Sequence, residues 1–120
     1  MLSVPRQVRI LLAMEPVDFR KGHSGLCGVV RNHLQGDPLD HVWVFHNKRR
    51  TALKLLWWDD GGFMVAHKKL ARGRFRLPLG EGDRLTLTSA ELSALLEGID
   101  LSRAQRLPRW NPPARGVKAA

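Results

Sequence analysis

The sequence predicts a single α+β domain with a mainly antiparallel meander sheet, two helices and a mobile basic C-terminal tail. Three observations lead to this prediction. The chain has 120 residues, of which 43% are hydrophobic and 26% charged, as is typical of one folded domain. Most apolar residues fall in short runs between turn-forming residues, which is the pattern of consecutive strands. Two segments instead repeat apolar residues at helical spacing, one after the first strand and one near the C-terminal end.

The first predicted elements are a strand and a helix. Residues 8–14 form a short apolar run that ends at Glu15 and Pro16, because proline has no N–H to give to a sheet. Asp18 is then expected to cap a helix. The buried face of this helix is predicted to contain Leu26, Val29, Val30 and Leu34, and Gly36-Asp37-Pro38 ends it.

A series of predicted strands follows. Residues 42–46, 52–58, 63–70, 72–77 and 84–88 each have the composition of a strand, and turn-forming residues separate them. Asp59-Asp60-Gly61-Gly62 is the clearest hairpin signal, because glycine accepts the positive φ angles that tight hairpins need. The connections are too short for crossovers, so we expect the sheet to be mainly antiparallel.

The last predicted element is a helix that begins at a capping box. Thr88 and Glu91 have the required S/T-x-x-E spacing. An apolar stripe then recurs at helical spacing, and Gly98 lies near the expected end of the helix. We expect this stripe to be core; its members are Leu92, Leu95, Leu96 and Ile99.

Domain organisation and location are predicted from the rest of the composition. Residues 1–101 form the expected domain, and residues 102–120 are expected to be a disordered basic tail because they contain several prolines and no acid. The chain has no apolar run of membrane-spanning length and no signal-peptide layout. Its single cysteine, Cys27, allows no internal disulfide. We therefore expect a cytoplasmic protein with no membrane partner.

The charge distribution favours DNA as a partner. The net charge is +9 and the isoelectric point about 11.1. Residues 48–76 alone carry +7, whereas residues 77–100 carry −4. Such a concentration favours a polyanion, because contacts with phosphates release counterions. The residues predicted to bind DNA are Lys48, Arg49, Arg50, Lys54, Lys68, Lys69, Arg72, Arg74 and Arg76. The alternative interpretation is an ordinary solvated sheet face.

Two local patterns sharpen this hypothesis. In a strand at residues 72–77, Arg72, Arg74 and Arg76 would share one face at roughly 6.8 Å per step, a spacing suited to contacts along a phosphate backbone. Such contacts position a protein without reading bases, so sequence selectivity should be weak. Trp57 and Trp58 would face opposite sides of their strand. A core role for both is favoured over base stacking or a protein contact.

Catalysis receives little support from the residue types. The chain has no tyrosine, so a tyrosine recombinase nucleophile is absent. Its histidines lack metal-ligand spacing, and no phosphate-binding loop occurs. Asp18 with Asp59 or Asp60, and Lys68, is the only set that could form a small metal nuclease. Turn and cap positions explain these aspartates better. We therefore predict no catalytic residue, metal, cofactor or small-molecule substrate.

Three segments resemble the transposase accessory protein of the insertion-sequence-66 family, the product of its second open reading frame, called TnpB. The first is Val17-Asp18-Phe19-Arg20-Lys21-Gly22 with Gly25-Leu26. The second runs from Val44-Phe45 through Arg49-Arg50 to Lys54-Leu55-Leu56-Trp57-Trp58-Asp59, Gly62-Phe63, and Lys69-Leu70-Ala71-Arg72-Gly73-Arg74-Phe75 with Pro78. The third runs from Leu92 through Leu95-Leu96-Glu97-Gly98-Ile99-Asp100. The resemblance covers about residues 4–100. It departs at His23-Ser24, where the family usually has an apolar residue and then Asp or Asn.

The resemblance implies a non-catalytic role in the DNA transposition of a bacterial mobile element, and it implies no catalytic residues. The partners it implies are the separate transposase and other proteins encoded by the same element. Together with the charge pattern, it favours an accessory protein that binds DNA, the transposase, or both through a basic sheet face. Two alternatives remain open at this stage, namely a small metal-dependent nuclease and a protein adaptor without DNA contact.

Overall fold

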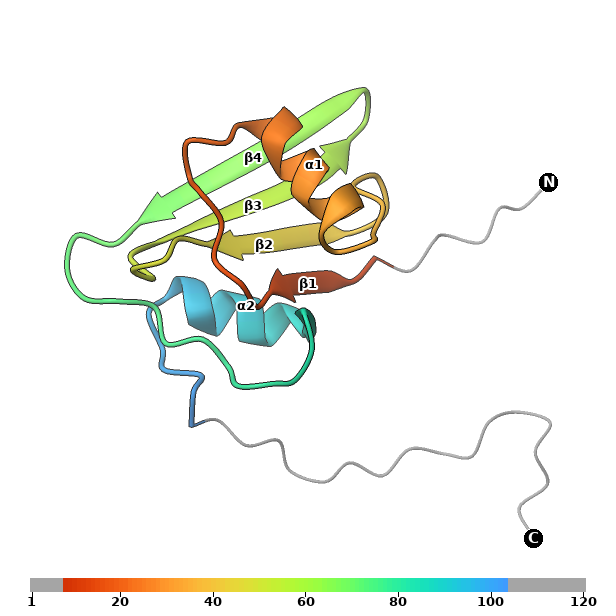
Figure 1. The fold of residues 1–120 in the computed structure, drawn as a ribbon. Helices are drawn as coiled ribbons and strands as arrows, with labels where there is room; N and C mark the ends of the chain where they lie inside the picture. The colour runs from red at the N-terminus through yellow and green to blue at the C-terminus, as the bar shows by residue number, and fades with distance from the viewer. Residues whose placement is uncertain (1–7, 104–120) are drawn as a thin grey trace, which may run out of the picture.

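The computed structural model describes residues 8–103 and consists of a five-stranded sheet and two helices (Figure 1). The strands are β1 (Ile10–Ala13), β2 (Val42–His46), β3 (Ala52–Asp59), β4 (Gly62–Lys69) and β5 (Arg84–Leu87). The helices are α1 (His23–Asn32) and α2 (Ser89–Leu96). The strand order across the sheet is β4-β3-β2-β1-β5. The predicted α+β class, with one helix after the first strand and one near the C-terminal end, is confirmed.

One strand pair is parallel. β1 pairs with β2 in parallel, whereas β1–β5, β2–β3 and β3–β4 are antiparallel. The prediction of a mainly antiparallel sheet is therefore confirmed. The reasoning that every connection is too short for a crossover is wrong for two of them, since the β4–β5 connection joins the two opposite edges of the sheet and the β1–β2 connection joins parallel strands. The segment between β1 and β2 contains α1, and a helix of this kind is the usual crossover between parallel strands.

The alternating side chains of the strands build a core on each face of the sheet. On the α1 side, Leu11, Trp43 and Phe45 pack with helix residues that include Leu26 and Val30. On the α2 side, Leu12, Val44 and Leu53 pack with Leu95 of the helix. Residues from the loop after β4 and from the segment after α2 complete this core. Those residues are Phe75, Leu77 and Leu101. The central strands are covered on both faces, which explains why they are almost wholly apolar.

The start of α1 differs from the prediction. The helix begins at His23, with Gly22 as its N-cap and no side-chain cap. Asp18 is not the cap, because its carboxylate accepts hydrogen bonds from the backbone and guanidinium of Arg20 instead. Both carboxylate oxygens of Asp18 are therefore bonded to Arg20 within the loop that precedes the helix. The loop then continues as far as Gly22.

The predicted strand at residues 72–77 is not formed. Gly73 has a φ of 77°, which turns the chain away from the direction of β4. Phe75 and Leu77 are buried in the α2-side core, and the Phe75 N–H donates to the Arg50 carbonyl (2.7 Å). The segment therefore covers one face of the sheet, so it does not extend the sheet at an edge.

Two apolar predictions are wrong in part. Leu95 is buried and Leu92 and Leu96 are half-buried, but Ile99 is 51% exposed because Gly98 (φ 85°) lies just beyond the end of the helix. The tryptophans do not both lie in the core, since Trp57 is half-buried and Trp58 is 43% exposed. The register of β3 with β2 ends at Leu56. Both tryptophans therefore lie beyond the end of β2 and have a neighbouring strand, β4, on one side only.

The predicted tail lies almost entirely outside the described residues. Leu101 is buried, and Ser102 donates to the Asp100 carboxylate through its N–H and its hydroxyl. Residues 104–120 are not described. Within residues 8–103, no helix is long and apolar enough to cross a membrane.

Candidate nucleic-acid interface

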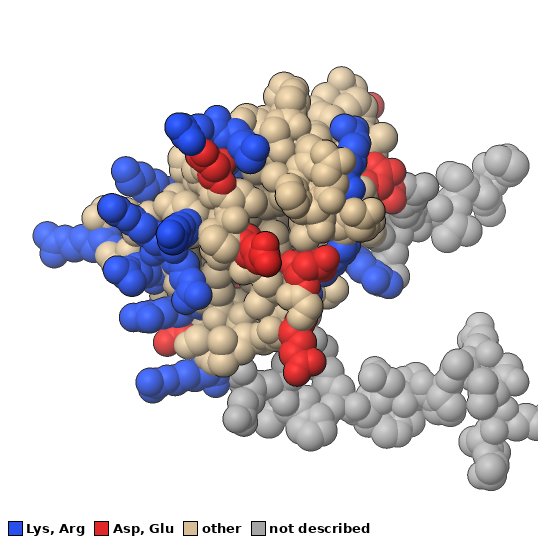
Figure 2. Space-filling model, in the orientation of Figure 1, with Lys and Arg blue, Asp and Glu red and all other residues tan. Residues whose placement is uncertain are grey.

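Three segments bring basic residues together at one end of the sheet. They are the β2–β3 turn, the end of β4 and the loop that follows it. Backbone hydrogen bonds join them, because the Leu70 N–H donates to the Thr51 carbonyl (2.8 Å) and the Phe75 N–H to the Arg50 carbonyl (2.7 Å). Figure 2 shows lysines and arginines gathered on the left, where β2 and β4 end in Figure 1. We call this set of exposed cations the basic end; it consists of Lys48, Arg49, Arg50, Lys69, Arg72, Arg74 and Arg76.

The β2–β3 turn is held by its own polar side chains. The Asn47 side-chain oxygen accepts the N–H groups of Thr51 (2.8 Å) and Ala52 (3.2 Å). Its amide nitrogen donates to the Thr51 hydroxyl (2.8 Å). Arg50 has a φ of 59°, in the left-handed region. These bonds fix the backbone of the turn, while the side chains of Lys48, Arg49 and Arg50 remain exposed.

The loop after β4 presents its arginines between buried anchors. Arg74 and Arg76 are exposed, whereas Phe75 and Leu77 are buried. The Arg76 carbonyl also accepts the N–H of Leu101 (3.0 Å). The predicted alternation of basic and apolar residues is therefore present from residue 74 to residue 77. Because no strand forms, the regular 6.8 Å spacing inferred from strand geometry does not apply.

The charges of the basic end are not neutralised by short ion pairs in the described part of the chain. The ion pairs formed there, Arg20–Asp18 (2.6 Å) and Arg84–Asp83 (2.9 Å), lie outside the basic end. Asp100 lies close enough to Arg76 for the arginine charge to change the pKa of its carboxyl group. Hydrogen bonds from Ser102 lower the pKa of Asp100, and the positive charges of Arg76 and Arg103 lower it further. The basic end thus keeps a concentrated positive potential.

Two of the predicted DNA-binding lysines are engaged within the fold. Lys54 is only 9% exposed, and its ammonium group donates to the carbonyls of Phe19 (2.8 Å) and Lys21 (2.9 Å). It also lies 5.1 Å from the centre of the Phe19 ring. Lys68 donates to the Leu96 carbonyl at the end of α2, where a cation complements the helix dipole. Lys54 therefore lies apart from the basic end, and the ammonium group of Lys68, although next to Lys69 in the chain, is held by α2.

The aspartates of the alternative nuclease hypothesis are not assembled into one site. Hydrogen bonds from Arg20 lower the pKa of Asp18 to about 2. Asp59 and Asp60 lie at the β3–β4 hairpin, at the far end of β3 from Ala52. Within residues 8–103, no three His, Cys, Asp or Glu side chains are placed to hold a metal ion.

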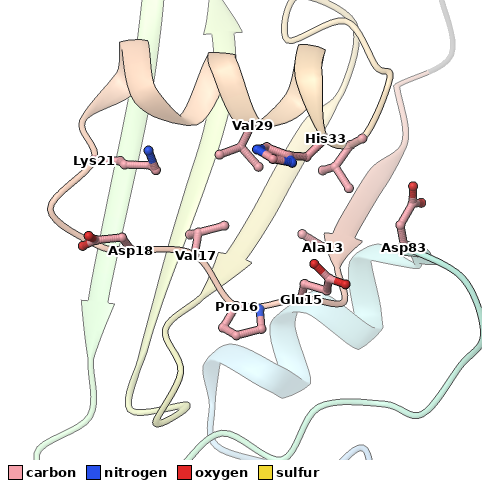
Figure 3. A pocket seen from close by; sticks show the side chains of 10 residues that line it. Ala13, Glu15, Pro16, Val17, Asp18, Lys21, Val29, His33 and Asp83 are labelled. Carbon is pink, nitrogen blue, oxygen red and sulfur yellow. The ribbon is translucent and has the colours of Figure 1, made fainter.

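A cavity of about 320 Å³ lies between α1 and the loop that follows β1 (Figure 3). Val17 and Val29 supply apolar surface, and His33, Glu15 and Asp83 supply polar groups. In Figure 3 the Asp18 carboxylate points away from those of Glu15 and Asp83. The carboxylates of this cavity therefore do not converge on one point.

The residues of the family-like motifs have mainly structural positions. Gly22 caps α1 and the Lys21 carbonyl binds Lys54. Gly73 turns the chain and Phe75 anchors the arginine loop. Trp58 packs edge-on against Phe63, with ring centres 5.1 Å apart. Sequence reasoning missed two features, namely the Asn47 side chain that holds the basic turn and the exposed strand edge beyond Phe63. The N-x-x-x-T spacing of Asn47 and Thr51 was the available signal for the first.

Comparison with known proteins identifies related sequences. Residues 8–106 match the family described as IS66 Orf2 like protein. The chain is 35% identical over 113 residues to the uncharacterized protein y4jC of Sinorhizobium fredii (strain NBRC 101917 / NGR234), covering 93% of this chain and 97% of the relative. It is 36% identical over 117 residues to the uncharacterized protein y4hO of the same strain, covering 97% and 100%. No solved structure matches.

Proposed function

We propose that this chain, which belongs to the IS66 Orf2-like family of transposition accessory proteins, holds DNA through its basic end during transposition. Family membership supports the context, namely the movement of an insertion sequence. Neither membership nor fold specifies the molecular task, because function resides in particular sites on a fold.

The observation that carries the proposal is the gathering of exposed cations from three chain segments on a fixed backbone. The Asn47 hydrogen bonds hold the first segment, and Phe75 anchors the third. Cations on a rigid scaffold lose less conformational freedom on binding than cations on a loose loop. Arginine also suits phosphate, because its planar guanidinium can donate two parallel hydrogen bonds.

The expected mode of binding is contact with the phosphate backbone. Within residues 8–103 the cations of the basic end come from the β2–β3 turn, the end of β4 and the loop that follows it, and none of them lies on a helix that could enter the major groove. Phosphate contacts fix position without reading sequence. We therefore expect similar affinity for the ends of the element and for unrelated DNA, and a steep decrease in affinity with salt.

The test compares two doubly substituted variants with the same change in charge. Arg74→Gln with Arg76→Gln alters the basic end, whereas Arg9→Gln with Arg31→Gln alters exposed arginines elsewhere. DNA affinity is measured by fluorescence anisotropy over a range of salt concentrations. The slope of log K against log salt is negative, and each lost phosphate contact reduces its magnitude by about 0.9. We therefore expect the magnitude to fall by about 1.8 for the first variant only.

Three other results would contradict the proposal. Equal effects of both variants would mean that net charge matters and the basic end does not. No effect of either would favour a protein adaptor, for which the transposase of the same element is the partner that the family context suggests. A pull-down from nuclease-treated extracts of cells that carry the whole element tests that alternative.

Cleavage of DNA with Mg²⁺ that is lost in Asp18→Ala would favour the nuclease alternative.

A further inference from the structure

The outer edge of β4 is long and apolar in its middle. β4 spans eight residues and is the terminal strand of the sheet, so no other strand in residues 8–103 pairs with its outer side. Val65 is 37% exposed on the face of the sheet where Trp58 packs against Phe63, and Met64 is 46% exposed on the opposite face. Natural proteins usually protect such edges with charges, proline or bulges. The centre of β4 has none of these protections.

The register of the hairpin shows which backbone groups of β4 face outward. Leu70 donates its N–H to the Thr51 carbonyl, and Asp59 lies opposite Gly62. In an antiparallel pair, hydrogen-bonded and non-bonded positions alternate. The even-numbered residues of β4 therefore bond to β3. The N–H and C=O groups of the odd-numbered residues face outward, and these residues are Phe63, Val65, His67 and Lys69.

We propose that β4 pairs with β4 of a second copy of this chain, forming an antiparallel dimer with one continuous sheet. Antiparallel self-pairing gives the two-fold symmetry that is commonest among protein oligomers. The register that pairs every outward-facing residue places Phe63 opposite the partner's Lys69 and Val65 opposite the partner's His67. Ala66 then lies on the symmetry axis, opposite the partner's Ala66. The main-chain hydrogen bonds resemble those of other strand-addition complexes.

Charge complementarity favours a second copy over a different partner. The two ends of the hairpin carry opposite charge, with Asp59 and Asp60 at the turn and Lys68 and Lys69 at the end of β4. Antiparallel self-pairing brings Asp59 and Asp60 of each copy toward Lys68 and Lys69 of the other. It also places Lys69 beside the partner's Phe63, where an ammonium group can lie over the ring. A partner strand with the same charge along its whole length would attract one end of this hairpin and repel the other.

Cysteine cross-linking tests the proposed register. In a non-hydrogen-bonded pair the two Cα atoms are about 4.5 Å apart, within the range of a disulfide. Ala66→Cys should therefore form a covalent dimer under mild oxidation. Thr86→Cys is the matched control, because Thr86 is an exposed residue of the opposite edge strand, β5. At about 10 µM protein, pairing should make the first reaction on the order of a hundredfold faster, because it raises the local thiol concentration to the millimolar range.

Sedimentation of the unmodified chain and of an edge variant completes the test. Val65→Lys places a charge in the middle of the edge, a natural protection against pairing, and should produce a monomer with an unchanged circular dichroism spectrum. Val65→Pro is a second disrupting variant, because its outward N–H is not used within the hairpin. A parent chain that sediments as a monomer would overturn the proposal. So would equal cross-linking rates of Ala66→Cys and Thr86→Cys. Neither readout depends on DNA binding.

Discussion

At the scale of single residues, Lys54 shows how a buried ammonium group can hold two distant segments together. It extends from β3 to the carbonyls of Phe19 and Lys21, in the loop before α1. Burying a cation without partners is unfavourable, so the two carbonyls and the Phe19 ring offset the loss of water. In return the loop is fixed against the sheet. Lys54 is thus a structural residue in a chain whose other lysines are mostly exposed.

Replacing Lys54 should lower stability and leave DNA binding nearly unchanged. Lys54→Met keeps the length of the side chain but leaves the two carbonyls without their donor, and we expect a loss of about 1–3 kcal/mol in the free energy of unfolding. Lys69→Met, on the neighbouring strand, is the control, and it should change stability little and weaken DNA binding. Urea unfolding and salt-dependent anisotropy measure the two effects. Equal stability of both variants would show that the Lys54 bonds are not structural.

At the scale of elements, α2 illustrates a helix whose start is fixed locally. The Thr88 hydroxyl accepts the Glu91 N–H (3.0 Å), and the Glu91 carboxylate accepts the Thr88 N–H (2.9 Å). Both bonds satisfy N–H groups at the start of the helix, where the chain offers no carbonyl partner. The cap also joins α2 directly to β5, which ends at Leu87.

Removing the cap should destabilise the domain by about 1 kcal/mol. Thr88→Ala loses the hydroxyl that accepts the Glu91 N–H. Ser89→Ala, at the next position, is the matched control, because Ser89 is exposed and should change stability by only a few tenths of a kcal/mol. Thermal unfolding of the two variants measures the difference. A shift of the same size in both would mean that loss of a hydroxyl in this segment, and not the cap, determines the effect.

Elements with local signals could be predicted from the sequence, and those that depend on distant contacts could not. The capping box of α2 and the Asp60-Gly61 turn of the β3–β4 hairpin are encoded within a few residues. The segment at residues 72–77 alternates like a strand, but its Phe75 and Leu77 are buried under the sheet, an outcome that requires the other core residues. The concentration of charge was predictable because it is a count along the sequence. The burial of Lys54 was not, because it depends on contacts with residues 19–21, more than 30 positions away.

At the scale of the whole molecule, the last described residues complete the core. Leu101 is buried among Phe75, Leu77 and Leu95, and its N–H donates to Arg76 in the loop of the basic end. The chain that follows α2 thus returns to the sheet and covers one side of the α2-side core. Leu101 therefore belongs to the packed core.

Truncations on either side of Leu101 should have different effects on stability. A chain that ends at Arg103 keeps this contact, and we expect its unfolding midpoint to match that of the full chain. A chain that ends at Gly98 loses a buried leucine, which costs about 2–5 kcal/mol. Its midpoint should fall by more than about 8 °C. Differential scanning calorimetry distinguishes the two. A large fall already in the longer truncation would show that residues 104–120 contribute to the folded state.

The position of β1 inside the sheet has a consequence for synthesis on the ribosome. β1 is made before the other strands of residues 8–103, but it lies between β2 and β5, and β5 is the last of these strands to be made. Translation adds about 5–20 residues per second, so β1 has one side unpaired for several seconds. During that interval the emerging chain exposes the apolar sequence Ile10-Leu11-Leu12-Ala13. An unfinished chain therefore cannot complete the sheet and presents an apolar strand that chaperones and proteases can recognise.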